Sequence, residues 1–402
     1  MLLLLVTSSI QGQPSSGGPV ATMDSDTISV RSVGAVGDGK SDDTGAFMEA
    51  VRRAHSERKP VYVPRGLYRI SKPIVLENAS LIGPDAGAWP ADTDAVPVIV
   101  PAHRDAPCVE LKAGGSLKGI CIRYEWDKEP EAGPPAVLVS GIGAWVSCVK
   151  IMYPWDGIVT DGVSNVGRLN LADVFIVSPR NIGVRVTGTW DVPALRNVEV
   201  WNAGPVARPL AKGIGFDLGK NDLIRLTDCF AFAMGTGFLL RDRIPGCKIE
   251  GGTWGVMTGC STDYCGIGIE VRGENTVSVS GGTYWQHHQS LIVDGDKARV
   301  RVTGAELKSN GSPAVEVRDS DHVVITGCSL LRPMKEHTPP AAALIGGRTI
   351  LQGNHIQSAG PGIAIGPKVR DAVINGNMLD VKGAEIEDKR AQPKTPPGSH
   401  VE

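Results

Sequence analysis

The segment "IGVRVTGTWDVPALRNVEVWNAG", residues 182–204, contains the pattern that decides the fold. Short apolar runs alternate with polar residues and are separated by glycine and asparagine. Related segments follow one another from about Ile28 to about Val381, at intervals of roughly 20 to 30 residues. Their runs are rich in valine and isoleucine and too short for helices, so each segment predicts short strands that form one coil of a repeat.

One coil cannot bury its apolar face alone, so the coils must stack, with each strand bonded to its equivalents in the neighbouring coils. We therefore predict an all-β fold, a single-stranded right-handed parallel β-helix over residues 27–383. A β-propeller would need a longer repeat and hairpin turns, and two-residue hairpin signals are mostly missing. Residues 384–402 are charged and rich in proline, which predicts a disordered tail.

Composition limits the partners of the chain. The 402 residues carry a formal net charge of −2 with no long run of one sign, which disfavours nucleic acid as a partner. No segment approaches the ~18 apolar residues of a transmembrane helix. Residues 1–26 predict a secretory leader or a disordered N-terminus. A leader would make the protein secreted, periplasmic or extracellular, and the sequence leaves open a monomer or a homotrimer.

The eight cysteines favour packing over metal chemistry. Four of them fall at the start of the last strand of their coils and predict a buried ladder: Cys121, Cys148, Cys229 and Cys328. Cys260 and Cys265, in "GCSTDYCG", either form a local disulfide in an exported protein or stay unpaired. No second Cys or His pair lies at ligand spacing, so neither a metal site nor a cofactor is predicted.

One helix is predicted near the N-terminus, opened by the cluster Asp42, Asp43 and Thr44. Apolar residues then fall at helical spacing on one face: Ala46, Phe47, Ala50, Val51 and Ala54. Because the end of a solenoid presents bare strand edges, we expect this capping helix to cover the first coil.

The sequence around this helix resembles a known family. From Val33 to Gly83, the motifs "GDGKSDDTGAF", "VYVPRGLYRIS" and "SLIG" are similar to the N-terminal segment of the pectate lyase-like superfamily. That superfamily includes polygalacturonase-related and rhamnogalacturonase-like proteins, epimerases, exo-glucanases and phage tailspikes. The resemblance implies a β-helix that handles a polysaccharide, and it leaves the reaction open.

Three insertions are expected to wall a groove: residues 85–106, 125–135 and 254–266. Aligned coils place a column of aromatic residues at the end of the last strand, where rings ~4.8 Å apart per coil would form a platform for sugars. The predicted substrate-binding residues are Trp126, Trp155, Trp201, Trp285, Tyr153 and Tyr284, with Tyr124 beside them.

Ionisable residues in the same region suggest hydrolysis. Cleavage of a glycosidic bond by hydrolysis needs two carboxylates that flank it. Asp156, in "YPWDGI", precedes a Gly-Ile strand and resembles the Asn-Thr-Asp-Gly-Ile-Asp element of polygalacturonases, so it is the first catalytic candidate. The next coils read "PRNIGV" and "FAMGTG" where that family has a second aspartate and Gly-His-Gly. We therefore expect Glu125 or Asp127, one coil away, to act as its partner.

Two other functions remain open. β-Elimination on a uronate needs a base and positive charge on the sugar carboxylate, for which Arg180, Lys308, His287 and His288 are candidates. A non-catalytic polysaccharide-binding or adhesion module would keep the aromatic column without catalytic residues. Our ranking is hydrolysis first, elimination second and binding alone third.

Overall fold

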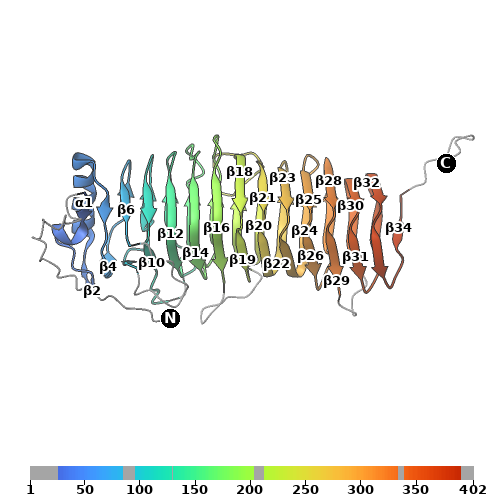
Figure 1. The fold of residues 1–402 in the computed structure, drawn as a ribbon, viewed down its shortest axis with the longest axis horizontal. Coiled ribbons are helices and arrows are strands. Elements are labelled where there is room, and N and C mark those ends of the chain that lie inside the picture. Colours follow the sequence, from blue (N-terminus) through green and yellow to red (C-terminus); the bar gives the residue numbers. More distant parts are fainter. Residues whose placement is uncertain (1–25, 85–95, 129, 203–211, 334–338, 391–402) are drawn as a thin grey trace, which may run out of the picture.

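A computed structural model describes residues 26–84, 96–128, 130–202, 212–333 and 339–390. Its strands pair in parallel from coil to coil and build an elongated solenoid whose coils follow one another in chain order (Figure 1). The predicted all-β solenoid is confirmed, and its geometry is that of a parallel β-helix. Its right-handedness stays a prediction from the usual hand of parallel crossovers.

Three parallel sheets run along the axis. The first contains β1 (Ile28–Ser29), β3 (Val61–Tyr62), β6 (Ser80–Ile82), β9 (Ser116–Lys118), β18 (Asn221–Thr227), β21 (Thr253–Thr258), β23 (Thr276–Ser280), β25 (Arg299–Thr303) and β28 (His322–Thr326). The second contains β2 (Asp38–Asp42), β4 (Leu67–Ile70), β7 (Val98–Pro101), β10 (Cys121–Arg123), β19 (Phe230–Phe232), β26 (Glu306–Ser309), β29 (Ser329–Arg332), β31 (His355–Ser358) and β33 (Met378–Val381). The third contains β5 (Ile74–Leu76), β8 (Val109–Leu111), β11 (Pro135–Val139), β13 (Asp156–Thr160), β15 (Ile182–Val186), β17 (Ile214–Leu218), β20 (Thr236–Arg241), β27 (Val315–Asp319) and β34 (Ile386–Asp388).

Longer strands bend from one sheet into the next. The strands that join the first and second sheets are β12 (Trp145–Met152), β14 (Asn170–Val177) and β16 (Ala194–Trp201). Those that join the second and third are β22 (Ser261–Arg272) and β24 (Thr283–Asp294). Those that join the third and first are β30 (Ala342–Gln352) and β32 (Ile363–Asn375). The inward residues of all three sheets form one continuous aliphatic core.

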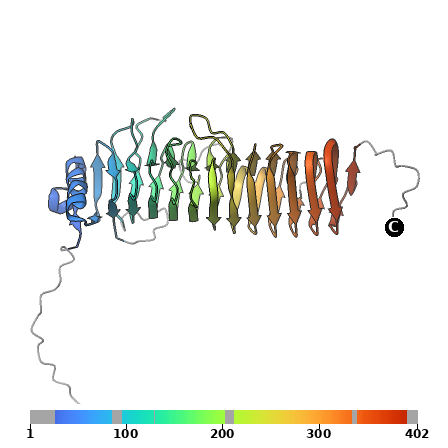
Figure 2. The same cartoon turned by 90° about the horizontal axis from the view of Figure 1, so that it is seen from above.

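The helix α1 (Thr44–Glu57) lies at the N-terminal end of the solenoid, after the short 3₁₀ helix η2 (Val30–Val33) (Figure 2). Its predicted apolar face is confirmed: all members are buried except the half-buried Val51. Phe47 packs edge-on against Tyr68, with ring centroids 5.5 Å apart. The helix packs on β1, β3 and β5. That it protects the first coil from a second chain stays a prediction.

The corner between the first and second sheets is one residue with left-handed backbone. Asp173, Asn197 and Asp228 take this role with φ of 55°, 50° and 54°, and glycine takes it in later coils. These residue types tolerate a positive φ best, which explains their recurrence between strands. Cys148 also occupies a corner, with φ 52°.

The predicted cysteine ladder is therefore only partly right. Cys148 is itself a corner residue. Cys121 lies on the outer side of the second sheet, where it pairs with Val98 and Lys150, because the corner residue shifts the register by one position. Cys229 and Cys260 lie in the buried position that follows the corner, in adjacent coils, with their thiols hydrogen-bonded to each other. No disulfide joins Cys260 to Cys265, since both thiols are free.

Glycine is the second residue of four successive third-sheet strands, β13, β15, β17 and β20, for a packing reason. A Cβ added to Gly183 would lie 2.5 Å from Cγ1 of Val200, an inward residue of the second sheet. Gly157 would meet Ile176 at 2.8 Å in the same way. The recurrent Gly-Ile and Gly-Val pairs thus mark the place where the two sheets approach each other most closely.

Gly183→Ala is expected to lower the free energy of unfolding by about 1–3 kcal/mol, because the added methyl overpacks the core. The measurement is chemical denaturation. Gly45→Ala is the matched control: no atom lies within 4 Å of its added Cβ, and alanine in a helix gains up to about 1 kcal/mol. Equal stability of the Gly183 variant and the wild type would contradict the packing argument.

A buried polar ladder fixes the turn from the third sheet to the first. Thr189, Asn221 and Thr253 occupy consecutive coils in register. The Asn221 side chain accepts a hydrogen bond from Thr189 Oγ1 (3.0 Å) and donates to the carbonyl of Val186 (2.9 Å). The next coil continues the ladder, because Thr253 N donates to Oδ1 of Asn275 (2.8 Å). Every buried amide and hydroxyl of this ladder therefore has a partner, which holds the turn rigidly.

Two boundaries differ from the predictions. β34 pairs with β32, so the solenoid extends into residues 384–390, because backbone pairing continues there although the side chains are charged. Residues 391–402, 1–25 and 85–95 lie outside the described residues. Residues 254–266 are mostly strand, in β21 and β22, since Trp254, Val256 and their neighbours keep a period of two. The excursion on this side is instead residues 242–252.

Candidate functional site

The outer face of the second sheet carries an aromatic stripe, made of Phe175, Trp201, Phe232, Tyr264 and Trp285 in successive coils. Strand register places Trp201, Phe232, Asp263, Trp285 and Lys308 in consecutive coils. Ring centroids of neighbouring members are 6.1 Å apart for Phe175 and Trp201, 6.3 Å for Trp201 and Phe232, and 6.0 Å for Phe232 and Tyr264. Sugar CH faces can stack on such rings.

Trp285, 42% exposed, ends the stripe. Its indole Nε1 donates to Oε1 of Glu306 (2.6 Å), and Lys308 Nζ lies 4.5 Å from its ring centroid. A cavity of about 150 Å³ opens beside it, lined by Asp263, Tyr264, Trp285, Gln286, Lys308 and Asn310. Two neighbours thus fix the ring orientation, and the cavity offers polar groups to a ligand on the ring.

Of the predicted aromatic residues, Trp201 and Trp285 belong to the stripe. Tyr284 is fully buried, because it is the inward residue next to Trp285 in β24, and it cannot contact a polysaccharide. Tyr124 is buried as well. Tyr153 and Trp155 are half-buried at the corner before β13.

Trp126 lies in a cluster of its own beside that corner. Its ring stacks on Tyr124 at 5.4 Å, and the guanidinium groups of Arg104 and Arg180 lie 4.9 and 5.1 Å from its centroid. Its Nε1 donates to the carbonyl of Tyr153 (2.7 Å). Cation–π contacts therefore occupy the ring that the sequence predicted as a sugar platform.

Asp156 opens β13 at the corner between the second and third sheets and is half-buried. Its Oδ1 accepts hydrogen bonds from Asn181 Nδ2 (2.9 Å) and the Ile182 backbone N–H (3.0 Å). Burial raises the pKa of Asp156 from 3.8 to about 6, against the opposing effect of these donors. A carboxyl group with such a pKa can both accept and release a proton near neutral pH.

The carboxylates predicted as partners of Asp156 lie in other surroundings. Glu125 is paired with Arg123 (2.9 Å) and Arg69 (3.3 Å), and Asp127 is exposed. The charge of Asp217 is one cause of the raised pKa of Asp156. Asp217 itself is fully buried, and its carboxylate forms ion pairs with Arg185 and Arg241. To act as the second carboxylate, Glu125 would have to leave its two arginines.

The predicted basic residues lie in different places. Arg180 Nη1 donates to the carbonyl of Tyr153 (2.6 Å), so its guanidinium lies beside the corner that leads to Asp156. Lys308 lies at Trp285, several coils away. His288 is exposed on β24, and the side chain of His287 lies outside the described part of the structure. No group of three His, Cys, Asp or Glu residues in the described ranges is arranged to hold a metal ion.

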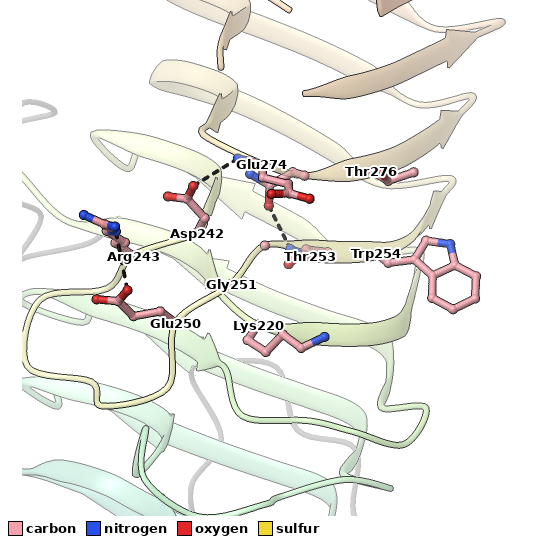
Figure 3. Close-up of a pocket in the computed structure, with 11 residues that line it drawn as sticks. Lys220, Asp242, Arg243, Glu250, Gly251, Thr253, Trp254, Glu274 and Thr276 are labelled. Atoms are coloured by element: carbon pink, nitrogen blue, oxygen red, sulfur yellow. Dashed lines mark hydrogen bonds and ion pairs between the residues drawn. The ribbon is translucent and has the colours of Figure 1, made fainter. Parts of the chain in front are cut away.

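A larger cavity that sequence reasoning missed opens at the turn from the third sheet to the first (Figure 3). Its volume is about 520 Å³, and its lining includes Lys220, Asp242, Arg243, Glu250, Trp254 and Glu274. The excursion at residues 242–252 forms one wall. The signal in the sequence was the segment "DRIPGCKIEGG", which breaks the alternation with proline and glycine.

A family model described as rhamnogalacturonase A/epimerase, pectate lyase-like matches residues 27–96. The pre-neck appendage protein of Bacillus phage B103 is 40% identical over 55 residues, which are 14% of this chain and only 6% of the phage protein.

The described helices include none long and apolar enough to cross a membrane.

Two solved structures share the fold at low identity. The A-module of the mannuronan C-5 epimerase AlgE4 from Azotobacter vinelandii has a TM-score of 0.56 and 15% identity, with 91% of this chain and 98% of that chain covered. PfbA, a surface adhesin of Streptococcus pneumoniae, has a TM-score of 0.55 and 12% identity, with 90% and 91% covered. At such identity these likenesses concern the fold alone.

The parallel pairing of strands from coil to coil defines a parallel β-helix. The family match and the structural neighbours together fit the pectate lyase-like β-helix superfamily, as the motifs between Val33 and Gly83 predicted. An epimerase and an adhesin both occur among these similar structures, so the shared fold leaves the function open.

Proposed function

We propose that this protein binds a uronate-containing polysaccharide along the aromatic stripe and that Asp156 acts on the chain as an acid/base group. The observation that carries the proposal is the continuity of the stripe, whose rings follow one another over adjacent coils of a rigid sheet. Isolated exposed aromatics are common on proteins, whereas an aligned row along one face needs a reason.

Charge supports a uronate. Arg104 and Arg180 lie against Trp126, and Lys308 lies on Trp285. Arg123 lies two coils before Phe175, the first residue of the stripe. Lysine and arginine side chains can pair with sugar carboxylates along the same face. A neutral polysaccharide could form hydrogen bonds but no ion pairs with these cations.

β-Elimination is the reaction that the geometry supports best. It needs one base, which Asp156 supplies, and positive charge near the uronate carboxylate, which Arg180 supplies. The base would remove the C5 proton, the electron pair would form the C4–C5 double bond, and the C4–oxygen bond would break, with its electrons leaving on the oxygen. Hydrolysis by Asp156 with Glu125 or Asp127 is the second candidate, because arginines hold Glu125 and Asp127 lies exposed to water.

Non-catalytic binding is the third candidate, favoured by the fold shared with an adhesin. In all three cases the protein would work outside the cell, where such polysaccharides occur, as a monomer or a homotrimer. No cofactor is part of the proposal.

Trp285→Ala is expected to weaken binding to polygalacturonate at least tenfold, because the stripe loses its terminal ring and Lys308 loses the ring that its ammonium group contacts. Affinity electrophoresis measures the change. Trp285→Phe keeps a ring and should lose less, and Met48→Ala, which removes a more exposed apolar side chain on α1, should lose nothing. Unchanged affinity in Trp285→Ala would remove the stripe from the binding site.

A further inference from the structure

The most exposed tryptophans of the described residues lie outside the stripe. Trp254 is 55% exposed, Trp145 54% and Trp190 49%, compared with 42% for Trp285. All three lie where the chain enters the first sheet, at the start of β12, before β16 and in β21. Single exposed indoles are common on protein surfaces, whereas indoles that share one column suggest a ligand, and Trp145 does not share the column of the other two.

Trp190 and Trp254 share one column. Each directly follows a member of the buried polar ladder, Thr189 and Thr253, which are in register through Asn221. The two indoles therefore stand two coils apart, about 10 Å along the axis at ~4.8 Å per coil. Because the ladder beneath them is fully hydrogen-bonded, their backbone is held in place before a ligand arrives.

The 520 Å³ cavity lies directly beside this column, with Trp254 at one end and the ion pair of Arg243 and Glu250 at the other (Figure 3). A second cavity of about 380 Å³ continues it into the next coil and shares Glu274 and Thr276. The two together form an open groove that can hold several sugar units and leads away from an aromatic platform.

The charges of this groove differ from those near the stripe. Its cations are already paired with carboxylates: Arg243 with Glu250 (3.5 Å), Lys297 with Glu274 (3.5 Å) and Arg299 with Asp321 (2.7 Å). Asp242 and Asp296 add negative charge to the lining. Carboxylates accept hydrogen bonds from sugar hydroxyls, and they repel a uronate.

We propose that the Trp190–Trp254 column and the adjoining groove form a second carbohydrate site, which binds a neutral oligosaccharide. Trp254 is its stacking platform, and the carboxylates of the groove accept hydrogen bonds from hydroxyl groups. This site lies on another sheet edge from the stripe and does not depend on the proposed action on uronates.

The test is isothermal titration of the full-length protein with neutral glucohexaoses of α and β linkage and, separately, with oligogalacturonate. Trp254→Ala is expected to weaken binding of a neutral hexasaccharide at least tenfold and to leave oligogalacturonate binding unchanged. Trp145→Ala is the matched control, because it removes an equally exposed indole that lies in a different column, and it should leave both affinities unchanged.

Glu250→Gln provides a second variant at the far end of the groove, where a largely exposed side chain can be changed without risk to the fold. This variant should weaken binding of the neutral hexasaccharide about fivefold, because the group that accepts a hydrogen bond from a sugar hydroxyl changes from a carboxylate to an amide. The proposal is overturned if no neutral hexasaccharide binds the wild type, or if both variants bind it normally. Loss of oligogalacturonate binding in Trp285→Ala alone tests the stripe and has no bearing on this groove.

Discussion

Asp156→Asn is expected to lower turnover of a uronate polysaccharide at least 100-fold while the protein stays folded. The amide cannot take up a proton, but its oxygen can still accept the hydrogen bonds from Asn181 and Ile182. The measurement follows the ultraviolet absorbance of unsaturated uronates and new reducing ends in parallel. Absorbance together with reducing ends identifies elimination, and reducing ends alone identify hydrolysis.

The pH dependence gives a second, independent readout for Asp156. As a base it must be ionised, so activity should rise with pH through about 6, the raised pKa of Asp156. Stability should change in the opposite direction, because between pH 3.8 and about 6 the folded state binds one more proton than the unfolded state. The wild type should lose about 3 kcal/mol over this window as pH rises, and Asp156→Asn should not show that loss.

Normal turnover in Asp156→Asn would show that another group is the base. Absence of both products from a protein that still binds the polysaccharide would instead favour the adhesion function. Arg180→Gln separates these cases further, because loss of the positive charge should slow elimination and leave binding along the stripe largely intact.

Asp217→Asn is expected to cost about 3–5 kcal/mol of unfolding free energy, since it leaves two mostly buried guanidinium groups without their anion. Asp217 is fully buried and accepts hydrogen bonds from Arg185 Nε (2.7 Å) and from Arg241 Nε and Nη2 (both 2.8 Å). Urea denaturation followed by far-ultraviolet circular dichroism measures the loss.

Asp191→Asn is the matched control for Asp217. Asp191 pairs with the well exposed Arg168, and surface ion pairs contribute about 0–1 kcal/mol. A similar small loss in both variants would mean that water or other groups compensate the two arginines. Loss of the Asp217 charge should also lower the pKa of Asp156, because that charge contributes to raising it.

The repeat was predictable because its causes are local. Alternating valine and isoleucine define the strands, and asparagine, aspartate and glycine define the corners, as Asn197 and Asp228 do. The apolar face of α1 followed from helical spacing in the same way. Each of these rules compares residues that lie close together in the chain, so one sequence is enough to apply them.

The site was less predictable because one residue decides which way a side chain points. Tyr284 and Trp285 are neighbours in the sequence, but one is in the core and the other in the stripe. A single left-handed corner residue changes the register of all that follows in its coil, so counting from strand ends misplaces a column. Pairing between coils, as of Glu125 with Arg69, joins residues that no local pattern relates.

The stacked coils also determine how the molecule would respond to force. Hydrogen bonds between coils run along the axis, and α1 and β34 lie at opposite ends of it (Figure 1). Tension between these ends would break the hydrogen bonds of one coil at a time, because each coil contacts only its neighbours. The C-terminal coil would detach first, since its side chains, such as Met378 and Ile386, are largely exposed. A polysaccharide held on the central coils would then remain bound while the end of the solenoid unwinds and absorbs mechanical work.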